Sequence, residues 1–212
     1  MTEMLVRVDE NDNQIGVEEK IKCHQPNGLL HRAFTALLFD SDGRLCLCKR
    51  SDVKMLWPRD WDGTFASHPR ENESYVDSGV RRMLDEVGTK CTLDYMNKFE
   101  YHVPYKNVGS ENEICATLIG VLNDPLAINP KPEEISDVVW VTADELCTLL
   151  LKDVSSYCPW MIIALYFMQD SKNNILEKYS PLLQNWLDGK TRAIFLSAIK
   201  KHMAGNRWRI LQ

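Results

Sequence analysis

The sequence predicts an α+β fold, a mixed α/β arrangement in which helices flank a mixed β-sheet and additional helices follow toward the C-terminus. Two observations lead to this prediction. Short apolar segments of strand-like composition surround one central segment with a helical period, and helix start signals gather in the last third of the chain. No second set of core-forming segments is visible. The 212 residues, 44% of them hydrophobic, therefore suit a single globular domain.

Strands are expected at residues 5–8, 33–39 and 44–50. The second and third of these form a predicted hairpin, because residues 40–43 read Asp-Ser-Asp-Gly, a strong turn signal. Apolar and β-branched residues predict further strands near residues 99–105, 111–121 and 138–141.

The central helix is expected to begin at Ser74, which forms a capping box with Asp77, and to stop at Gly88. Helical spacing places four apolar residues on its buried face: Val76, Val80, Met83 and Val87.

Three later helices are expected. Thr142 and Glu145 form a second capping box, which opens a helix to about Lys152. Pro159 suits the first turn of a helix that runs to about Gln169. Residues 181–202 should be helical, and their apolar residues are Trp186, Ile194, Phe195 and Ile199.

Composition and charge exclude several classes of protein. A net charge of −5 gives no general attraction to nucleic acid or to an anionic membrane, so a polyanion needs a local cluster of bases or a metal. No apolar run reaches the roughly 20 residues that span a bilayer. Residues 1–4 have neither the basic region nor the long apolar stretch of a signal peptide, so none is expected there. The seven scattered cysteines suit reduced thiols. We expect a cytoplasmic protein with no nucleic-acid partner and no membrane insertion; its oligomeric state stays open, with a monomer favoured.

The central helix carries a charged motif. Glu73 precedes Arg81 by eight residues, and residues 81–88 read Arg-Arg-Met-Leu-Asp-Glu-Val-Gly. A helix can present a carboxylate such as Glu86 to Mg²⁺ while its apolar face packs on a sheet. This pattern resembles the Nudix box, with two departures: Ser67 replaces its first glycine, and Arg82 replaces a glutamate. Arg82 could contact a phosphate. The alternative is a helix whose charges only form Glu–Arg pairs.

A second set of candidate ligands surrounds this helix in the sequence. Two glutamates lie two apart in an expected strand, so their side chains share a face and need a cation, a shared proton or solvent. Any one histidine of the set would more often be structural. Three histidines and two carboxylates together suit a first-row divalent metal. The set comprises His24, His31, His68, Glu111 and Glu113.

His31, His68, Glu111 and Glu113 occur within short segments that resemble the type I isopentenyl-diphosphate isomerases, a family with a Nudix fold, and His24 lies shortly before the first of these segments. The matching segments are residues 28–34 (Gly-Leu-Leu-His-Arg-Ala-Phe), 50–52 (Arg-Ser-Asp), 57–58 (Trp-Pro), 67–69 (Ser-His-Pro), 111–113 (Glu-Asn-Glu) and 159–160 (Pro-Trp). The resemblance covers roughly residues 4 to 170. We therefore expect residues 1–170 to form the isomerase-like domain and residues 171–212 to be a helical extension of the same domain.

The resemblance implies a role for each matching position. The His/Glu set would bind a divalent metal (Mn²⁺, Zn²⁺ or Mg²⁺), and Glu86 a second ion, a Mg²⁺ that bridges to the diphosphate. Glu113 with Tyr101 would protonate the alkene. Trp160 would stabilise a tertiary carbocation by cation–π attraction. Lys20, Arg50 and Lys54, supported by Arg82, would bind the diphosphate of a small prenyl substrate. Without the resemblance these bases would be read as surface charges and Trp160 as a core aromatic.

One catalytic position departs from the family. Ala66 stands where the family has a cysteine that removes or delivers the second proton, and an alanine can do neither. An engineered Cys→Ala change would leave the neighbours alone. Arg59, Asp62 and Gly63 also differ from the family pattern, which favours natural divergence.

Three functions remain open. The first is an isomerase-type enzyme for isopentenyl and dimethylallyl diphosphates, with Asp62, Ser67 or the diphosphate as substitute base. The second is a protonation-initiated cyclase or rearranging enzyme on a longer or modified prenyl diphosphate. The third is an inactive prenyl-diphosphate-binding variant.

Overall fold

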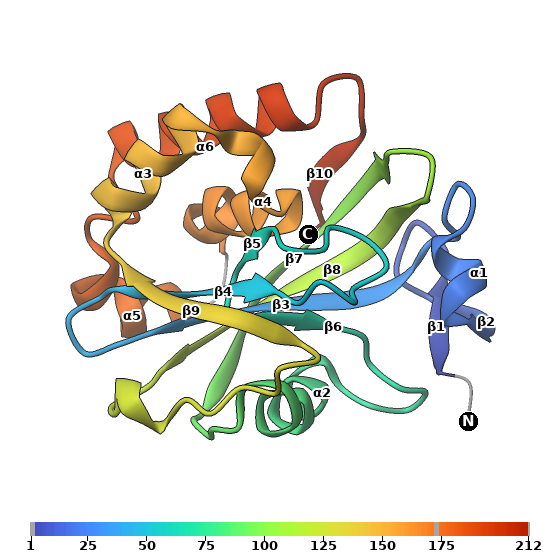
Figure 1. Ribbon diagram of the computed structural model, residues 1–212, viewed down its shortest axis with the longest axis horizontal. Helices are drawn as coiled ribbons and strands as arrows, with labels where there is room; N and C mark the ends of the chain where they lie inside the picture. Colours follow the sequence, from blue (N-terminus) through green and yellow to red (C-terminus); the bar gives the residue numbers. More distant parts are fainter. Residues whose placement is uncertain (1–2, 172–173, 212) are drawn as a thin grey trace.

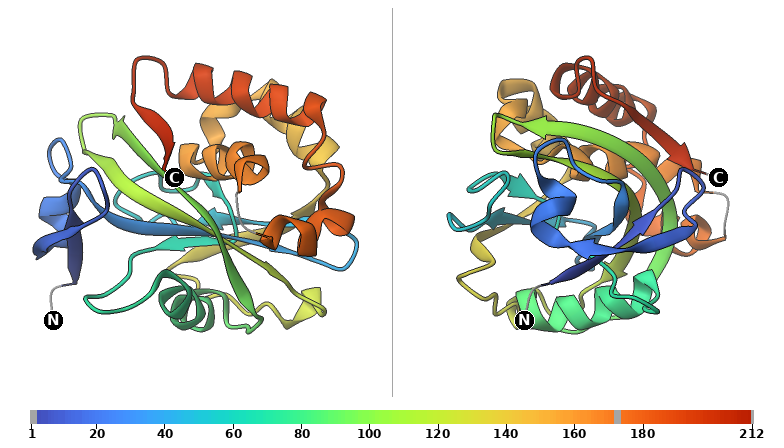
Figure 2. Two further views of the ribbon diagram at one scale, coloured as in Figure 1. Left: turned by 180° about the vertical axis from the view of Figure 1, so that it is seen from behind. Right: turned by 90° about the vertical axis from the view of Figure 1, so that its right-hand side faces the viewer.

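Helices cover both faces of a twisted mixed sheet in the computed structural model, which describes residues 3–171 and 174–211 (Figure 1). The strands are β1 (Met4–Val8), β2 (Gln14–Glu19), β3 (His31–Phe39), β4 (Leu45–Arg50), β5 (Trp61–Asp62), β6 (Phe65–Ser67), β7 (Leu93–Tyr105), β8 (Gly109–Val121), β9 (Ile135–Val141) and β10 (Trp208–Leu211). The helices are α1 (Lys20–His24), α2 (Tyr75–Arg82), α3 (Ala143–Lys152), α4 (Pro159–Phe167), α5 (Ile175–Leu183) and α6 (Gly189–His202). Figure 2 shows α2 on one face of the sheet and α4 and α6 on the other.

The sheet runs in the order β10-β7-β8-β3-β1-β2, with β6 also paired to β3 and with β4, β5 and β9 joined off this path. Strands β3 and β8 are parallel, and their register pairs His31 with Glu113. Strands β7 and β8 are antiparallel, and their register pairs Tyr101 with Glu113. Because paired residues in neighbouring strands present their side chains close together, this register alone brings His31, Glu113 and Tyr101 into one row.

The predicted hairpin is right at its turn and wrong along most of its length. The N–H of Gly43 donates to the carbonyl of Asp40, as expected for a tight turn. Beyond the turn only Phe39 and Leu45 pair between β3 and β4. The two strands then separate, because β3 pairs with β8 and β6 while β4 pairs with β9 and β5.

The buried face of α2 differs from the prediction at Val80, which is 42% exposed. Ser74 caps the helix by accepting from the N–H of Asp77. Gly79 is buried instead of Val80, and a Cβ on Gly79 would lie 2.5 Å from Cδ1 of Leu118. The physical reason is a change of period. Residues Met83–Val87 form a π-helical turn, so the four apolar residues predicted at a 3.6-residue spacing span two different periods, and a single face drawn through Val87 and Met83 does not continue to Val80.

The C-terminal region contains two helices and a strand. The expected single helix over residues 181–202 is interrupted, because Asp188 caps α6 by accepting from the N–H groups of Lys190 and Thr191. No pattern in the sequence predicts β2, α1 or β10. Helix α4 is almost wholly buried, and its core cluster includes Trp186 and Phe195 from the C-terminal region. Within the described residues, no helix is long and apolar enough to cross a membrane.

Candidate active site

A cavity of about 290 Å³ lies at the row formed by β3, β8 and β7. It collects predicted residues from seven separate segments of the chain. They are Lys20, His24, Arg50, Lys54, Ala66, His68, Arg82, Tyr101, Glu111, Glu113 and Trp160. The two remaining predicted residues lie beside it: Nε2 of His31 is 3.4 Å from Oε1 of Glu113. Glu86 lines an adjoining hollow together with Arg50, Lys54 and Ala66.

The three histidines and two glutamates form one buried cluster. The ring centroids of His24 and His31 are 4.8 Å apart, and that of His68 lies 5.4 Å and 5.1 Å from them. Nε2 of His24 is 3.0 Å from Oε2 of Glu111, and Nε2 of His68 is 3.2 Å from Oε1 of Glu113. The Nδ1 atoms of His24 and His31 face the carbonyls of Lys20 and Leu29 at 2.6 and 2.7 Å. An Nδ1–H that donates to a backbone carbonyl leaves the Nε2 lone pair free for a metal.

Two buried atoms of the cluster test whether a metal fits. Among the described residues, Nε2 of His31 and Oε2 of Glu111 make no hydrogen bond of good geometry, although they face Oε1 of Glu113 at 3.4 Å and Nε2 of His24 at 3.0 Å. Buried polar atoms are rarely left without a well-formed hydrogen bond, so both atoms can take a ligand. One ligand atom each from His24, His31, His68 and Glu113 lies within 4.8 Å of the others. Imidazole and carboxylate ligands suit first-row divalent cations. The cluster can therefore hold such an ion, with Glu111 beside it.

Opposite pKa shifts mark the electrostatics of this cluster. Burial lowers the pKa of His24, but the carboxylate of Glu111 and the carbonyl of Lys20 outweigh it and raise this pKa to about 9. Burial holds the pKa of His68 well below its usual value, and the nearby Lys20 charge adds to this. Burial also favours a neutral Glu113, yet contacts from His31 and Tyr101 hold the Glu113 pKa below its usual value. Glu111 and Glu113 thus make the centre of the cluster favourable for a positive charge, either a protonated His24 or a bound cation.

Tyr101 and Trp160 complete the chemical side of the cavity. The hydroxyl of Tyr101 donates to Oε2 of Glu113 at 2.7 Å. Burial, and then the charge of Glu113, raise the pKa of Tyr101 well above its usual value, so its hydroxyl keeps its proton. The ring of Trp160 lies 6.3 Å from that of Tyr101 and 5.2 Å from that of Trp57, centroid to centroid. The cavity therefore places an O–H donor, a carboxyl and an aromatic wall together.

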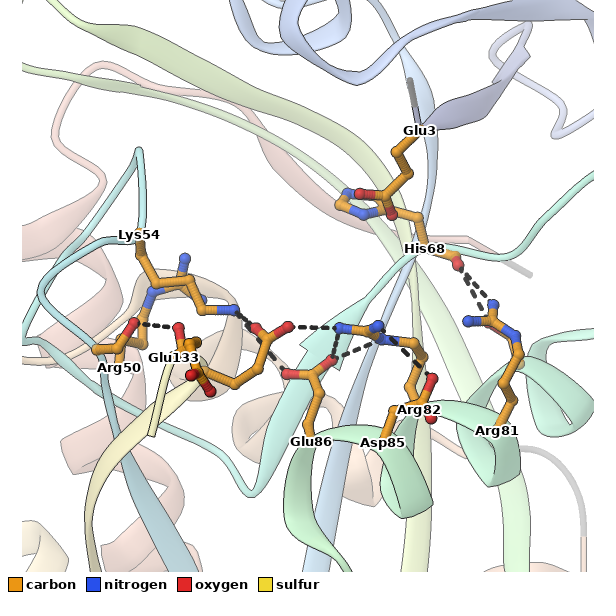
Figure 3. Close-up of polar contacts among 12 residues, drawn as sticks. Glu3, Arg50, Lys54, His68, Arg81, Arg82, Asp85, Glu86 and Glu133 are labelled. Atoms are coloured by element: carbon orange, nitrogen blue, oxygen red, sulfur yellow. Dashed lines mark hydrogen bonds and ion pairs between the residues drawn. The ribbon is translucent and has the colours of Figure 1, made fainter. Parts of the chain in front are cut away.

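A network of charges lies on the α2 side of the cavity (Figure 3). Arg82 contacts Glu86 at 2.6 Å and Glu134 at 3.1 Å, and Lys54 also pairs with Glu134. Burial raises the pKa of Glu86 despite these cations. Sequence reasoning missed Glu134, because no motif surrounds it and only the fold brings its loop to Lys54. Glu134 thus pairs with two of the bases that are expected to hold a diphosphate.

The other two predicted bases are held differently. Arg50 donates to the carbonyls of Trp57 and Leu56 at 3.0 and 2.9 Å. Its guanidinium also lies over the ring of Trp160, 5.3 Å from the centroid. Lys20 pairs with Glu3 at 2.9 Å, and its side chain is 41% exposed. Lys20 is thus freer to move toward a ligand than Arg50.

Comparisons with known proteins agree with these observations. A model of the NUDIX domain matches residues 29–161. An isopentenyl-diphosphate Delta-isomerase from Haloarcula marismortui is 37% identical and aligns with 76% of this chain and 88% of its own length. An isopentenyl-diphosphate Delta-isomerase 1 from Bos taurus is 35% identical, over 72% of this chain and 74% of its own. A crystal structure from Deinococcus radiodurans has a TM-score of 0.62 at 17% identity, covers 76% of this chain and 97% of that chain, and supports the fold alone.

The family model spans most of the residues that build the cavity, and the alignments extend over most of both chains. The expected mixed α/β fold and the resemblance drawn from the short motifs are both confirmed. The chain belongs to the isopentenyl-diphosphate Delta-isomerase family of NUDIX proteins.

Proposed function

We propose that this protein is a metal-dependent isomerase of prenyl diphosphates, which begins by protonating a C=C bond through Glu113 and Tyr101. The 2.7 Å hydrogen bond between these residues, inside a cavity also lined by Trp160, carries the proposal. The names of the relatives support isopentenyl diphosphate as the first candidate substrate. The Tyr101–Glu113 pair has no evident use in a protein that only binds its ligand.

The reaction needs a proton donor, a stabilised cation and a proton acceptor. Because its pKa is below the usual value, Glu113 must first take up a proton from solvent; hydrogen-bonded to Tyr101, it then delivers this proton to the terminal alkene carbon and leaves a tertiary cation. The face of Trp160 stabilises that cation, an effect worth about 2 kcal/mol in a desolvated site. A divalent cation in the His/Glu cluster would supply positive charge that orients Glu113. The reaction also needs a proton acceptor, and Ala66 offers no group that could serve as one.

The diphosphate would lie on the α2 side of the cavity. Lys54 and Arg82 supply positive charge there, and Lys20 lies at the cavity wall. Glu86 fits a ligand of a bridging Mg²⁺, which commonly shares one or two carboxylates with substrate phosphates. This division separates the bases that hold the diphosphate from the acid that protonates the alkene.

A second candidate is a cyclase or rearranging enzyme on a longer prenyl diphosphate. Val53 and Met55 line the cavity and are 72% and 37% exposed, so its mouth offers apolar surface to a longer chain. In such a substrate an internal alkene would capture the cation, and no base would be needed at that step.

One experiment separates these functions. The protein is incubated with Mg²⁺ in D₂O and diphosphates of five, ten, fifteen and twenty carbons, and the products are analysed by NMR and mass spectrometry. Interconversion of the five-carbon compounds supports the isomerase, and a deuterated cyclic product from a longer substrate supports the cyclase. Glu113→Gln and Tyr101→Phe should each lower turnover by about 10²-fold or more. No turnover of any substrate by the wild type would contradict both enzymes and leave the inactive binding variant.

A further inference from the structure

Asp62 on β5 is a fully buried carboxyl beside the position that lacks the family's thiol. Its side chain is 4% exposed. Oδ1 accepts hydrogen bonds from Nε1 of Trp160 at 2.8 Å and from the N–H of Gly63 at 2.7 Å. Oδ2 faces only Nη1 of Arg50, at 3.4 Å, among the described residues. One oxygen is thus held by the fold while the other keeps spare acceptor capacity.

Asp62 lines a small hollow that lies beside the cavity. The hollow has a volume of about 10 Å³, and its lining includes Asp62, Thr64 and Ala66. Ala66 also lines the main cavity, so the hollow and the cavity are neighbours at the position where the family carries its cysteine. A polar hollow of this size has room for about one water molecule. A carboxylate therefore lines the space next to the Ala66 methyl group.

We propose that Asp62 accepts the proton that the cation loses, directly or through one water in this hollow, in place of the missing thiol. The inference rests on the proposed function and names the base that function lacks. The electron pair of the broken C–H bond forms the new C=C bond, and the proton moves to Oδ2 of Asp62. A bridging water would accept one proton and pass on another. Asp62 then returns its proton to solvent, and Glu113 regains one, so no further reactant is consumed.

The surroundings of Asp62 suit this role. Burial raises its pKa, although the charge of Arg50 and the hydrogen bonds from Gly63 and Trp160 act in the opposite direction. A carboxyl with a raised pKa can carry a proton for part of a catalytic cycle. Trp160 contacts both the proposed base and the residue paired with the acid, since its Nε1 donates to Asp62 and its ring lies beside that of Tyr101. A cation on the face of Trp160 would therefore lie near both the acid and the base.

The hydroxyl and the thiols near Ala66 are poorer bases than Asp62. No described hydrogen bond joins the Ser67 hydroxyl to a group that could take its proton. Cys48 lines the hollow, but its contact with Cys46 and its burial raise its pKa well above the usual value. Burial does the same for Cys115, which lines the main cavity. Both thiols thus stay protonated at neutral pH, and a carboxylate remains the available acceptor.

Asp62→Asn tests the role with little disturbance, because the amide oxygen can still accept from Trp160 and Gly63. The assay uses isopentenyl diphosphate and Mg²⁺ in D₂O. NMR follows deuterium in the terminal methylene of recovered substrate, which reports protonation by Glu113, and the isomerised product, which needs the second base. We expect Asp62→Asn to lower product formation by about 10²-fold while deuterium still enters the substrate. Asp60→Asn is the matched control, because Asp60 is a partly buried carboxyl close in sequence but does not line the hollow. It should change neither deuterium uptake nor product formation.

A rescue variant separates catalysis from structure. Adding Ala66→Cys to Asp62→Asn restores the thiol at the other end of the hollow and should recover product formation at least tenfold. Two outcomes would overturn the assignment of Asp62 and leave the proposed function standing. One is that Asp62→Asn forms product at the rate of the wild type. The other is that the double variant folds but Ala66→Cys does not restore product formation. Absence of both deuterium uptake and product in the wild type would instead remove the proposed function, and this assignment with it.

Discussion

Glu73 shows at the scale of one residue how a charged motif residue supports the helix that carries it. Its carboxylate accepts two hydrogen bonds from Arg81, both of 2.7 Å. A third comes from the N–H of Arg70 at 2.8 Å. The hydrogen bonds from Arg81 are the largest cause that lowers the pKa of Glu73 from 4.5 to about 2. The Nudix-like Glu–Arg spacing thus serves the structure at this position.

Glu73 should make stability depend on pH. Because its folded pKa is lowered, its contribution is complete above pH 4.5 and is lost as the pH falls toward 2. We expect Glu73→Gln to lower the free energy of unfolding by about 1 kcal/mol at pH 7. The difference from wild type should shrink below pH 4.5. Urea unfolding at several pH values measures it, with exposed Glu71→Gln as the control. A difference that does not change with pH would contradict this role.

Glu134 should compete with a bound diphosphate. Burial acts against its charge, but Lys54 and Arg82 hold the pKa of Glu134 below its usual value, so it is an anion among the bases expected to bind substrate. We expect Glu134→Gln to tighten the binding of inorganic pyrophosphate about fivefold, since freeing a partly exposed ion pair is worth about 1 kcal/mol. Calorimetric titration in metal-free buffer measures the Kd. The neighbouring Glu133→Gln is the control, and weaker binding by Glu134→Gln would show that Glu134 assists binding.

Single residues also show how far sequence reasoning reaches. His31, His68, Glu111 and Glu113 could be predicted as a set because each lies in a short recognisable segment, and His24 through its place shortly before the first of these segments; the fold brings all five within contact distance. Glu134 and the Trp160–Asp62 hydrogen bond could not be assigned. Trp160 and Asp62 are 98 residues apart, and no local pattern encodes which strand edge meets which helix. The locking of Arg50 by two backbone carbonyls likewise depends on a loop conformation.

At the scale of elements, the positions of the central strands and helices were predictable, whereas β2, α1 and β10 and the pairing partners of the strands were not. Residues 33–39 were expected as a strand, but alternation says nothing about whether β4 or β8 pairs along its length. The pairing with β8 is the one that matters, because it aligns His31 with Glu113. The π-helical turn after α2 was also outside the reach of a fixed helical period. That turn carries Glu86, so a helical period that is wrong by one residue there would misplace a side chain of the candidate site.

Gly88 ends this π-helical turn, and replacing it should be costly. Its φ is 69°, and a Cβ would lie 2.2 Å from the carbonyl oxygen of Asn129, a backbone atom that cannot turn aside. Left-handed backbone costs a non-glycine residue about 1–2 kcal/mol before this clash is counted. We expect Gly88→Ala to lower the free energy of unfolding by at least about 2 kcal/mol. Gly189→Ala, where a Cβ meets nothing within 4 Å, is the control and should stay close to wild type in urea unfolding.

At the scale of the whole molecule, residues beyond 170 share a core with the rest of the described chain. Phe195 and Ile199 of α6 belong to the same buried cluster as Ile162 of α4 and Phe39 of β3. Strand β10 pairs with β7, and its register sets Trp208 opposite Tyr101. The C-terminal region therefore supports the strand that carries part of the candidate site. The division into residues 1–170 and an extension of the same domain stays a prediction, and these contacts favour it.

Removing the extension tests that division. Helix α4 is apolar around its whole circumference, and in a chain of residues 1–170 the face that packs against α6 would be exposed to water. Burying one large apolar side chain contributes about 1.5–3 kcal/mol, so losing several such contacts exceeds the stability of a typical domain. We expect the full chain to unfold in one transition by both circular dichroism and tryptophan fluorescence. The shortened chain should bind a hydrophobic dye and show no cooperative transition. Cooperative unfolding of the shortened chain at nearly the full stability would show instead that residues 171–212 form a separate unit.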